Sequence, residues 1–224
     1  MSTSTRATER NTLARVLRVR SGKLSATSLH HLVRTFRAGG VVIFPTETVY
    51  GIGASAFSPA GIRRIYQLKG RRWTKPLALL VPALEAARPL VEFLPAEAFR
   101  LARAFWPGPL TLVLPASPLG RLITGGLTTI GVRVPRHPVP LAILQALDVP
   151  LATTSVNRSG HEPAISGVAA IKRFGSKVDW VVDGGTCTLQ EASSVVDLSH
   201  FPFTVKRQGA IAKQTLEKTL FQPA

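Results

Sequence analysis

The segments of this chain alternate between helix-like and strand-like patterns, and this alternation most constrains its fold. Apolar residues at helical spacing, with capping residues and prolines at their ends, mark helices at 29–36, 59–69, 95–105, 138–147 and 168–174. Short apolar runs mark strands at 16–19, 41–44, 76–81, 110–114, 129–134, 151–154, 180–182, 195–198 and 203–206. Such interleaving predicts an α/β domain with helices flanking one large sheet. Because several strands follow one another directly, we expect a mixed β-sheet.

One domain is expected over residues 21–224, because no linker or shift in composition interrupts the alternation. Residues 1–20 are rich in Arg, Ser and Thr, with Glu9 as their only acid. Mitochondrial transit peptides share this composition, but a short flexible basic arm is the simpler interpretation and favours a cytoplasmic protein. No apolar run approaches the roughly 18 residues that a membrane-spanning helix needs, so no membrane partner is expected.

The charge of the chain is strongly positive, since 28 Lys and Arg residues against 12 Asp and Glu residues give +16 at neutral pH. The imbalance is local, because no acidic residue lies between Glu47 and Glu85 or between Glu97 and Asp148. A field of this sign attracts nucleotides, RNA or anionic membranes, although a generally basic soluble protein has the same total. Charge alone therefore does not separate these partners.

Several common catalytic motifs are missing from the sequence. There is no Walker A loop, no complete dinucleotide fingerprint, no His-Glu-x-x-His and no Gly-x-Ser-x-Gly. The five histidines have no metal-ligand spacing. Cys187 is the only cysteine, and its immediate neighbours offer no base, so we expect a buried, inert thiol. A zinc site or a serine hydrolase therefore has little support.

Polar and cationic side chains gather in four segments, mostly at the ends of expected elements. Residues 45–51 follow a strand, 69–72 end a helix, 153–160 leave a strand, and Arg133 interrupts an apolar strand. Each has an ordinary interpretation as a turn, a helix-dipole partner or a surface residue. Together they offer cations for phosphates and small polar groups. This combination favours nucleotide chemistry by positioning and charge stabilisation.

Taken in order, these segments resemble the motifs of the YrdC-like family of threonylcarbamoyl-AMP synthases. The motifs are Pro-Thr-Glu-Thr-Val-Tyr-Gly-Ile-Gly, Lys-x-Arg, Trp-Pro-Gly-Pro-Leu-Thr, Arg-Val-Pro and Ser-x-Asn with Ser-Gly. The ordered set is specific although no single motif is, and it extends over about residues 29–210. The resemblance implies a twisted sheet with a deep basic cavity, in the short, single-domain form of the family.

The resemblance also implies a reaction. L-Threonine and bicarbonate give a carbamate, whose carboxylate attacks the α-phosphate of ATP and releases pyrophosphate. Mg²⁺ is expected on the phosphates. A separate threonylcarbamoyl transferase complex then transfers the threonylcarbamoyl group to an adenosine in tRNA. The partners implied are therefore ATP, L-threonine and bicarbonate, with tRNA or double-stranded RNA as further candidates.

Residue roles follow from the matched motifs. Catalytic and ATP-binding roles are implied for Lys69, Arg71, Ser155 and Asn157, and ATP binding also for Arg207.

Substrate binding is implied for three further residues. These are Thr46 and Ser193 on the threonine side, and Arg133 on a substrate carboxylate or phosphate. Three positions depart from the family pattern: Arg72 stands where proline is usual, Val156 stands where alanine is common, and Ser194 replaces a threonine.

Two other functions compete with the synthase. The first is a non-catalytic protein that binds structured or double-stranded RNA. The positive charge of the chain supports this hypothesis. With three Trp and two Tyr, the chain supplies few aromatic rings for base stacking. The second is the carbamoyl-transfer role of YrdC-like domains in hydrogenase-maturation proteins. The zinc-finger and acylphosphatase segments of those proteins have no counterpart here. A glycine-containing segment at 123–127 is a candidate lid.

Overall fold

The computed structural model describes residues 15–19 and 22–221. Its strands are β1 (Arg15–Arg18), β2 (Val42–Phe44), β3 (Gly51–Ser55), β4 (Ala78–Leu80), β5 (Leu110–Pro115), β6 (Thr129–Arg133), β7 (Leu151–Ser155), β8 (Trp180–Asp183), β9 (Ser194–Asp197) and β10 (Thr204–Arg207). Its helices are α1 (Ala26–Arg37), α2 (Pro59–Lys69), α3 (Ala96–Phe105), α4 (Pro118–Thr124), α5 (Pro138–Leu147), α6 (Gly167–Phe174) and α7 (Lys213–Phe221), with short 3₁₀ turns η1 (Glu85–Leu90) and η2 (Gly175–Lys177). The predicted α/β class is confirmed.

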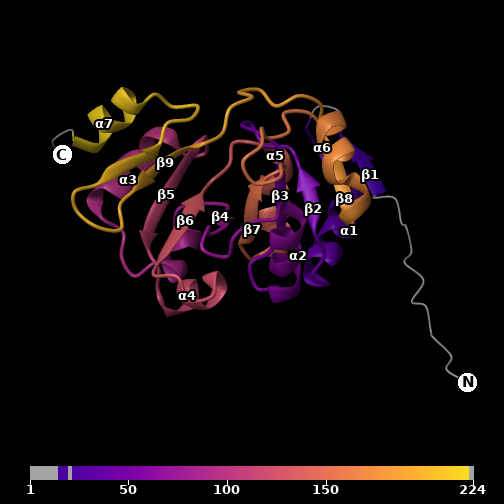
Figure 1. The fold of residues 1–224 in the computed structure, drawn as a ribbon, viewed down its shortest axis with the longest axis horizontal. Helices are drawn as coiled ribbons and strands as arrows, with labels where there is room; N and C mark the ends of the chain where they lie inside the picture. Colours follow the sequence, from indigo (N-terminus) through magenta and orange to yellow (C-terminus); the bar gives the residue numbers. More distant parts are fainter. Residues whose placement is uncertain (1–14, 20–21, 222–224) are drawn as a thin grey trace, which may run out of the picture.

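All these strands join one sheet in the order β1-β8-β2-β3-β7-β4-β6-β5-β9-β10. The sheet is mixed, as expected: β8 pairs in parallel with β1 and β2, whereas β7 pairs antiparallel with β3 and β4. It runs across the whole molecule, with β1 and α6 near one end and α3 and α7 near the other (Figure 1).

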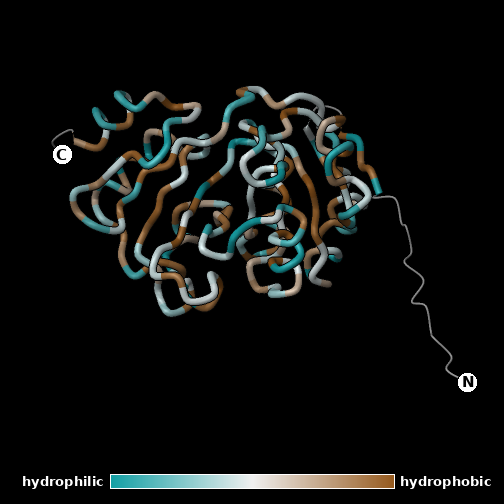
Figure 2. The backbone as a smooth tube through the Cα atoms, in the orientation of Figure 1, coloured by the Kyte–Doolittle hydropathy of each residue, from teal (hydrophilic) through white to brown (hydrophobic). Residues whose placement is uncertain are grey.

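Both faces of the sheet are buried over much of its width. On β2, Ile43 belongs to the larger core cluster, whereas its neighbours Val42 and Phe44 belong to a second cluster. The second cluster holds the apolar sides of α1 and α5, which pack against each other. Helices α2, α3, α6 and α7 contribute to the larger cluster. Long stretches of the strands are accordingly hydrophobic (Figure 2). This two-sided burial explains why β2 reads as a continuous apolar run.

Helix ends follow the sequence signals closely. The Ser25 side chain caps α1 by accepting from the Ser28 amide at 3.1 Å. Ser58 caps α2 ahead of Pro59, and Gly70 ends that helix in the left-handed conformation. Only glycine adopts this conformation without strain. The end of α2 is therefore fixed at the residue next to Lys69, which places the Lys-x-Arg motif at a sharp turn.

Some elements differ from the sequence-based expectation. The strand expected at 16–19 forms as β1, so the sheet already includes residues that we assigned to the N-terminal arm. Residues 1–14 and 20 of that arm lie outside the described residues. The sequence patterns did not indicate β3, α4 or α7. The candidate lid at 123–127 begins in the last turn of α4, whose cap is Gly125.

Within the part of the chain that the structure describes, no helix has both the length and the apolar character needed to cross a bilayer.

Candidate active site

A cavity of about 450 Å³ lies on the face of the sheet that also carries α1 and α5. Phe44 and Leu80 line it and also belong to the core cluster under those two helices. The cavity extends over β3, β7, β4, β6, β5 and β9, and the loop that follows α2 closes one side. It is the candidate active site because it collects most of the residues that the sequence singled out.

Strand alternation determines which side chains reach the cavity. On β5, Thr111 and Val113 line it, whereas Leu110, Leu112 and Leu114 are fully buried in the larger core cluster. Successive side chains of a strand point to opposite faces, so one strand contributes both a cavity wall and core packing. Strand β6 does the same, and this places Arg133 on the cavity side of an otherwise apolar strand.

Three guanidinium groups line the cavity, those of Arg71, Arg133 and Arg207. None of the described residues that line it is an Asp or a Glu. Partial burial lowers the pKa of Arg207, and the positive charges of Arg133 and Arg71 lower it further. The three groups therefore repel one another across a shared space, and an anion in that space would relieve the repulsion.

Arg133 is held by a buried ion pair with Glu47, at 2.8 Å between Nη2 and Oε1. Its Nη2 also donates to the Thr48 hydroxyl at 3.0 Å, and its Nε donates to the Gly108 carbonyl at 3.0 Å. The second oxygen of Glu47, Oε2, is buried and has no hydrogen-bond partner among the described residues. Arg133 is thus fixed in place, and unlike Arg71 and Arg207 it has a carboxylate partner among the described residues.

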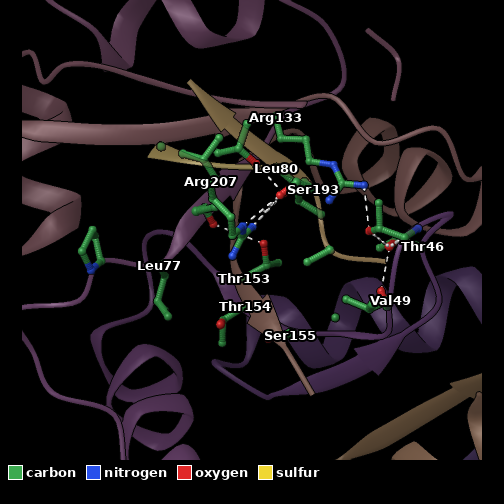
Figure 3. Close-up of a pocket in the computed structure, with 18 of the residues that line it drawn as sticks. Thr46, Val49, Leu77, Leu80, Arg133, Thr153, Thr154, Ser155, Ser193 and Arg207 are labelled. Atoms are coloured by element: carbon green, nitrogen blue, oxygen red, sulfur yellow. Dashed lines mark hydrogen bonds between the residues drawn. The ribbon is translucent and has the colours of Figure 1, made fainter. Parts of the chain in front are cut away.

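Thr46 and Ser193 lie at different parts of the cavity wall (Figure 3). The Thr46 hydroxyl donates to the Val49 carbonyl at 2.7 Å, which closes the turn after β2. Ser193 is bonded through its hydroxyl to Thr111 at 3.0 Å, and its carbonyl accepts from the Arg207 guanidinium at 2.7 Å. In Figure 3, Arg133 reaches toward the segment that carries Thr46, and Arg207 meets Ser193.

Lys69 and Asn157 lie behind the cavity wall and form a cluster with Ser155, which also lines the cavity. The Lys69 ammonium donates to the Ser155 carbonyl, and to the carbonyl and Oδ1 of Asn157 at 2.8 Å each. Oδ1 of Asn157 also accepts from the Ser155 hydroxyl at 2.6 Å, and its amide donates to the His161 carbonyl at 2.6 Å. Lys69 is 2% exposed. Burial, with the Arg71 charge as a second cause, lowers the pKa of Lys69 to about 7.

A comparison with models of known protein families identifies the family of this chain. The family model Sua5/YciO/YrdC, described as telomere recombination, matches residues 34–209. The chain belongs to the Sua5/YciO/YrdC family.

Individual members of the Sua5/YciO/YrdC family cover most of this chain. The threonylcarbamoyl-AMP synthase of Pyrococcus abyssi is 40% identical over 185 residues, which are 82% of this chain and 54% of that protein. The Bacillus subtilis threonylcarbamoyl-AMP synthase is 34% identical over 186 residues, with the same two shares. The chain thus spans about half the length of these curated relatives. The crystal structure of P. abyssi Sua5 complexed with L-threonine has a TM-score of 0.86 and 36% identity, covering 94% of this chain and 61% of that one.

The structure divides the residues predicted from the family motifs into two groups. Six of them line the cavity: Thr46, Arg71, Arg133, Ser155, Ser193 and Arg207. Lys69 and Asn157 do not line it, and their polar atoms are used within the cluster behind the wall. The catalytic roles of these residues stay predictions.

The polar residues of the cavity wall that received no role from the sequence include Thr48, Lys75 and Thr111. Thr48 and Thr111 contact residues that were predicted, Arg133 and Ser193 respectively. A signal for Thr111 was present, since it is polar and alternates with leucines on β5. Lys75 gave no such signal, because the loop that carries it has no periodicity.

The cysteine prediction is confirmed, because Cys187 is buried and free. Burial raises the pKa of its thiol to about 11, so little of it is thiolate at neutral pH. Among the described residues there is also no cluster of three or more His, Cys, Asp or Glu side chains that could hold a metal ion.

Proposed function

We propose that this protein forms threonylcarbamoyl-AMP and pyrophosphate from L-threonine, bicarbonate and ATP. The observation that carries the proposal is a cavity lined by three guanidinium groups without a lining carboxylate. Such a cavity suits a substrate with several negative charges, as a nucleoside triphosphate has. The names of the relatives and the L-threonine in the P. abyssi Sua5 structure support the choice of substrates. The product would serve a separate threonylcarbamoyl transferase that modifies tRNA.

The reaction requires the protein to position its substrates rather than to supply a nucleophile of its own. The carbamate of threonine supplies a carboxylate oxygen that attacks the α-phosphorus of ATP, and the bond from that phosphorus to the bridging oxygen breaks, so pyrophosphate leaves. Arg71 and Arg207 would stabilise the negative charge on the phosphates. Arg133, fixed by Glu47, would orient the carboxylate of threonine. Thr46 and Ser193 would contact the threonine side of the substrate.

Mg²⁺ is proposed to enter with ATP. The described lining residues offer hydroxyls but no carboxylate, and Mg²⁺ prefers hard oxygen ligands such as phosphate oxygens and water. These residues fit a metal that is held mainly by the nucleotide. Its chemical contribution is to neutralise phosphate charge.

The test is pyrophosphate release from ATP and Mg²⁺, measured with and without L-threonine and bicarbonate. Release that requires both substrates, and that falls when serine replaces threonine, is the expected result. Absence of release from folded protein that binds ATP would contradict the proposal, unless addition of a transferase restores it.

We infer tRNA binding as a second, compatible function. A depression of about 340 Å³ on the surface is lined by four cationic residues, Arg64, Lys69, Arg158 and Lys177, and none of its described lining residues is acidic. Asp179 lies beside it and pairs with Arg64 at 2.6 Å, which leaves Arg158 and Lys177 as the main charges for a phosphate backbone. The expected result is tRNA binding that weakens steeply with salt. Binding that is absent at low salt would remove this function.

A further inference from the structure

An apolar groove of about 490 Å³ lies between α2 and α4, on the face of the sheet opposite the candidate active site. Strand β4 shows the change of face, because Ala78 and Leu80 line the active-site cavity whereas Leu79, between them, lines the groove. Figure 1 shows both helices along the lower side of the molecule. The groove is therefore a separate site, and it shares the loop residues Pro76 and Leu77 with the cavity.

Three large apolar side chains at the rim of the groove are exposed to solvent. Phe57, Trp73 and Leu122 all line the groove, and they are 49%, 57% and 76% exposed. Trp73 is held in place because its ring stacks on that of Tyr66, with 4.1 Å between the ring centroids. Single exposed apolar residues are common, but a cluster of them around a concave surface is typical of an interaction site. The groove is accordingly a candidate docking surface.

The shape of the groove distinguishes between kinds of occupant. Its floor is formed by buried residues of the sheet, among them Leu79 and Ala152, and the segment 123–127, which the sequence offered as a candidate lid, supplies part of one wall. A membrane surface is contacted by apolar side chains that protrude, whereas here they surround a hollow. A hollow between two helices suits an amphipathic helix whose apolar side chains enter it.

The charge around the groove indicates the polarity of such a helix. Arg63 lines the groove and is exposed, and none of the described lining residues is acidic. The sequences of α2, of α4 and of the loop at 70–77 contain no Asp or Glu. Arg121, at the end of α4, is paired with Glu92 at 3.6 Å, whereas Arg63 has no ion-pair partner among the described residues.

A second copy of this chain is a poor occupant of the groove. It would carry the same net charge of +16, and two proteins of equal charge repel each other. A partner with carboxylates beside its apolar residues would instead be attracted to Arg63.

We propose that the groove between α2 and α4 is the docking site of a partner protein, which enters it with an amphipathic helix whose polar face is acidic. The apolar side chains of that helix fill the space between Phe57, Trp73 and Leu122, and its carboxylates face Arg63. The docked helix also contacts Pro76, so partner and active-site cavity meet at the loop between α2 and β4. The inference rests on the groove alone and does not depend on the reaction proposed above.

The probe is a display library of helical peptides with randomised surface residues, selected for binding to the full-length protein. We expect the enriched peptides to carry leucine or aromatic residues on one face and Asp or Glu on the other. Calorimetry with an enriched peptide then compares two variants. Leu122→Glu places a negative charge in the groove and should weaken binding at least about tenfold. Val168→Glu, at a residue of α6 that is 73% exposed, is the matched control and should change binding less than about twofold.

Reversal of one charge separates electrostatic recognition from loss of structure. Arg63→Glu should weaken binding of the acidic peptide about tenfold and should strengthen binding of the same peptide with Lys in place of its acidic residues. A variant that had merely lost its fold would bind neither peptide. Unchanged preference of Arg63→Glu for the acidic peptide would contradict the role given to Arg63.

Three results would overturn the docking proposal. The first is a selection that enriches no peptide or only peptides without acidic residues. The second is an enriched acidic peptide that binds Leu122→Glu as tightly as wild type. The third is an empty selection together with binding to vesicles of phosphatidylcholine and phosphatidylserine that Leu122→Glu abolishes, because the exposed rim would then be a membrane contact.

Discussion

Two buried cations, Arg133 and Lys69, are similarly enclosed but are compensated in different ways. Arg133 pairs with a buried carboxylate, Glu47, at 2.8 Å. Lys69 is surrounded by neutral oxygens of Ser155 and Asn157, and its pKa is lowered to about 7, first by burial and then by the Arg71 charge. Arg133 therefore has a carboxylate partner at the cavity wall, whereas Lys69 can exchange a proton near neutral pH.

The difference gives two charged residues of the family motifs distinct environments, one at the cavity wall and one outside its lining. Arg133 lines the cavity together with Arg71 and Arg207, so its charge contributes to the field that an anion meets. Lys69 holds two chain segments together, and the amide of Ser159 reinforces the link by donating to the Lys69 carbonyl at 3.1 Å. Variants that remove one partner at a time can separate these two kinds of contribution.

The largest expected effect is loss of the Arg133 counter-charge. Glu47→Ala would leave a buried guanidinium unpaired, so the free energy of unfolding should fall by about 3–5 kcal/mol. Urea denaturation measures it. Glu97→Ala, which removes a more exposed pair with Arg100, is the control and should cost no more than about 1 kcal/mol. Equal losses in the two variants would show that the buried Glu47 pair contributes no more to the free energy of unfolding than the more exposed Glu97 pair.

Removal of a fixed charge from the cavity should act on catalysis rather than on folding. Arg207→Ala should lower kcat/KM for pyrophosphate release by about 10²- to 10³-fold, as loss of a preorganised donor does. Its melting temperature should not fall markedly, because Arg207 is exposed and is repelled by two other arginines. Arg103→Ala, on the exposed side of α3, is the matched control. Activity that falls equally in the control would point to a general charge effect.

Removal of the lysine behind the wall should act on folding. Lys69→Met keeps most of the side-chain volume but leaves carbonyl oxygens without a donor, so the free energy of unfolding should fall by about 1–3 kcal/mol. Lys75→Met, at an exposed position, should change it by less than about 0.5 kcal/mol. Chemical denaturation of both variants gives the comparison, and a Lys69→Met protein as stable as wild type would contradict the proposed structural role.

Measured per pH unit, the pH dependence of stability should be the smallest effect. A lysine whose pKa is about 7 when folded and about 10.4 when unfolded binds fewer protons in the native state between these values. Stability must then rise with pH across that window, by up to about 1.4 kcal/mol per pH unit. Denaturation at pH 7, 8 and 9 should show that the free energy of unfolding of wild type rises relative to that of Lys69→Met. A constant difference between the two proteins would mean that the Lys69 pKa is not lowered.

Much of the fold was predictable because its signals are local. Ser25, Ser58 and Gly70 mark helix ends through their own side-chain and backbone preferences, and each acts where the sequence indicated. Strand β3 was missed because its sequence, Gly-Ile-Gly-Ala-Ser, has little β-propensity. Its glycines are required by packing instead: a Cβ at Gly53 would lie 2.8 Å from the Thr153 side chain and 3.0 Å from that of Phe44.

The site was predictable as a set of residues but not as an arrangement. Arg133 signals itself by interrupting an apolar strand, yet its partner Glu47 lies 86 residues away in the sequence. Lys69 and Arg71 form one motif, but the left-handed turn at Gly70 directs one side chain behind the wall and the other into the cavity. The spacing of the motif does not predict that these two side chains separate, because their positions depend on the oxygens that surround each cation after folding.

The alternation along β5 restricts how this chain can change over evolution. Thr111 and Val113 face the cavity only because Leu110, Leu112 and Leu114 occupy the intervening positions. An insertion or deletion of one residue within the strand would move leucines into the cavity and a hydroxyl into the core. New substrate preferences are therefore expected to arise by replacement of side chains on β5 and β6, whereas length variation is confined to the connecting loops.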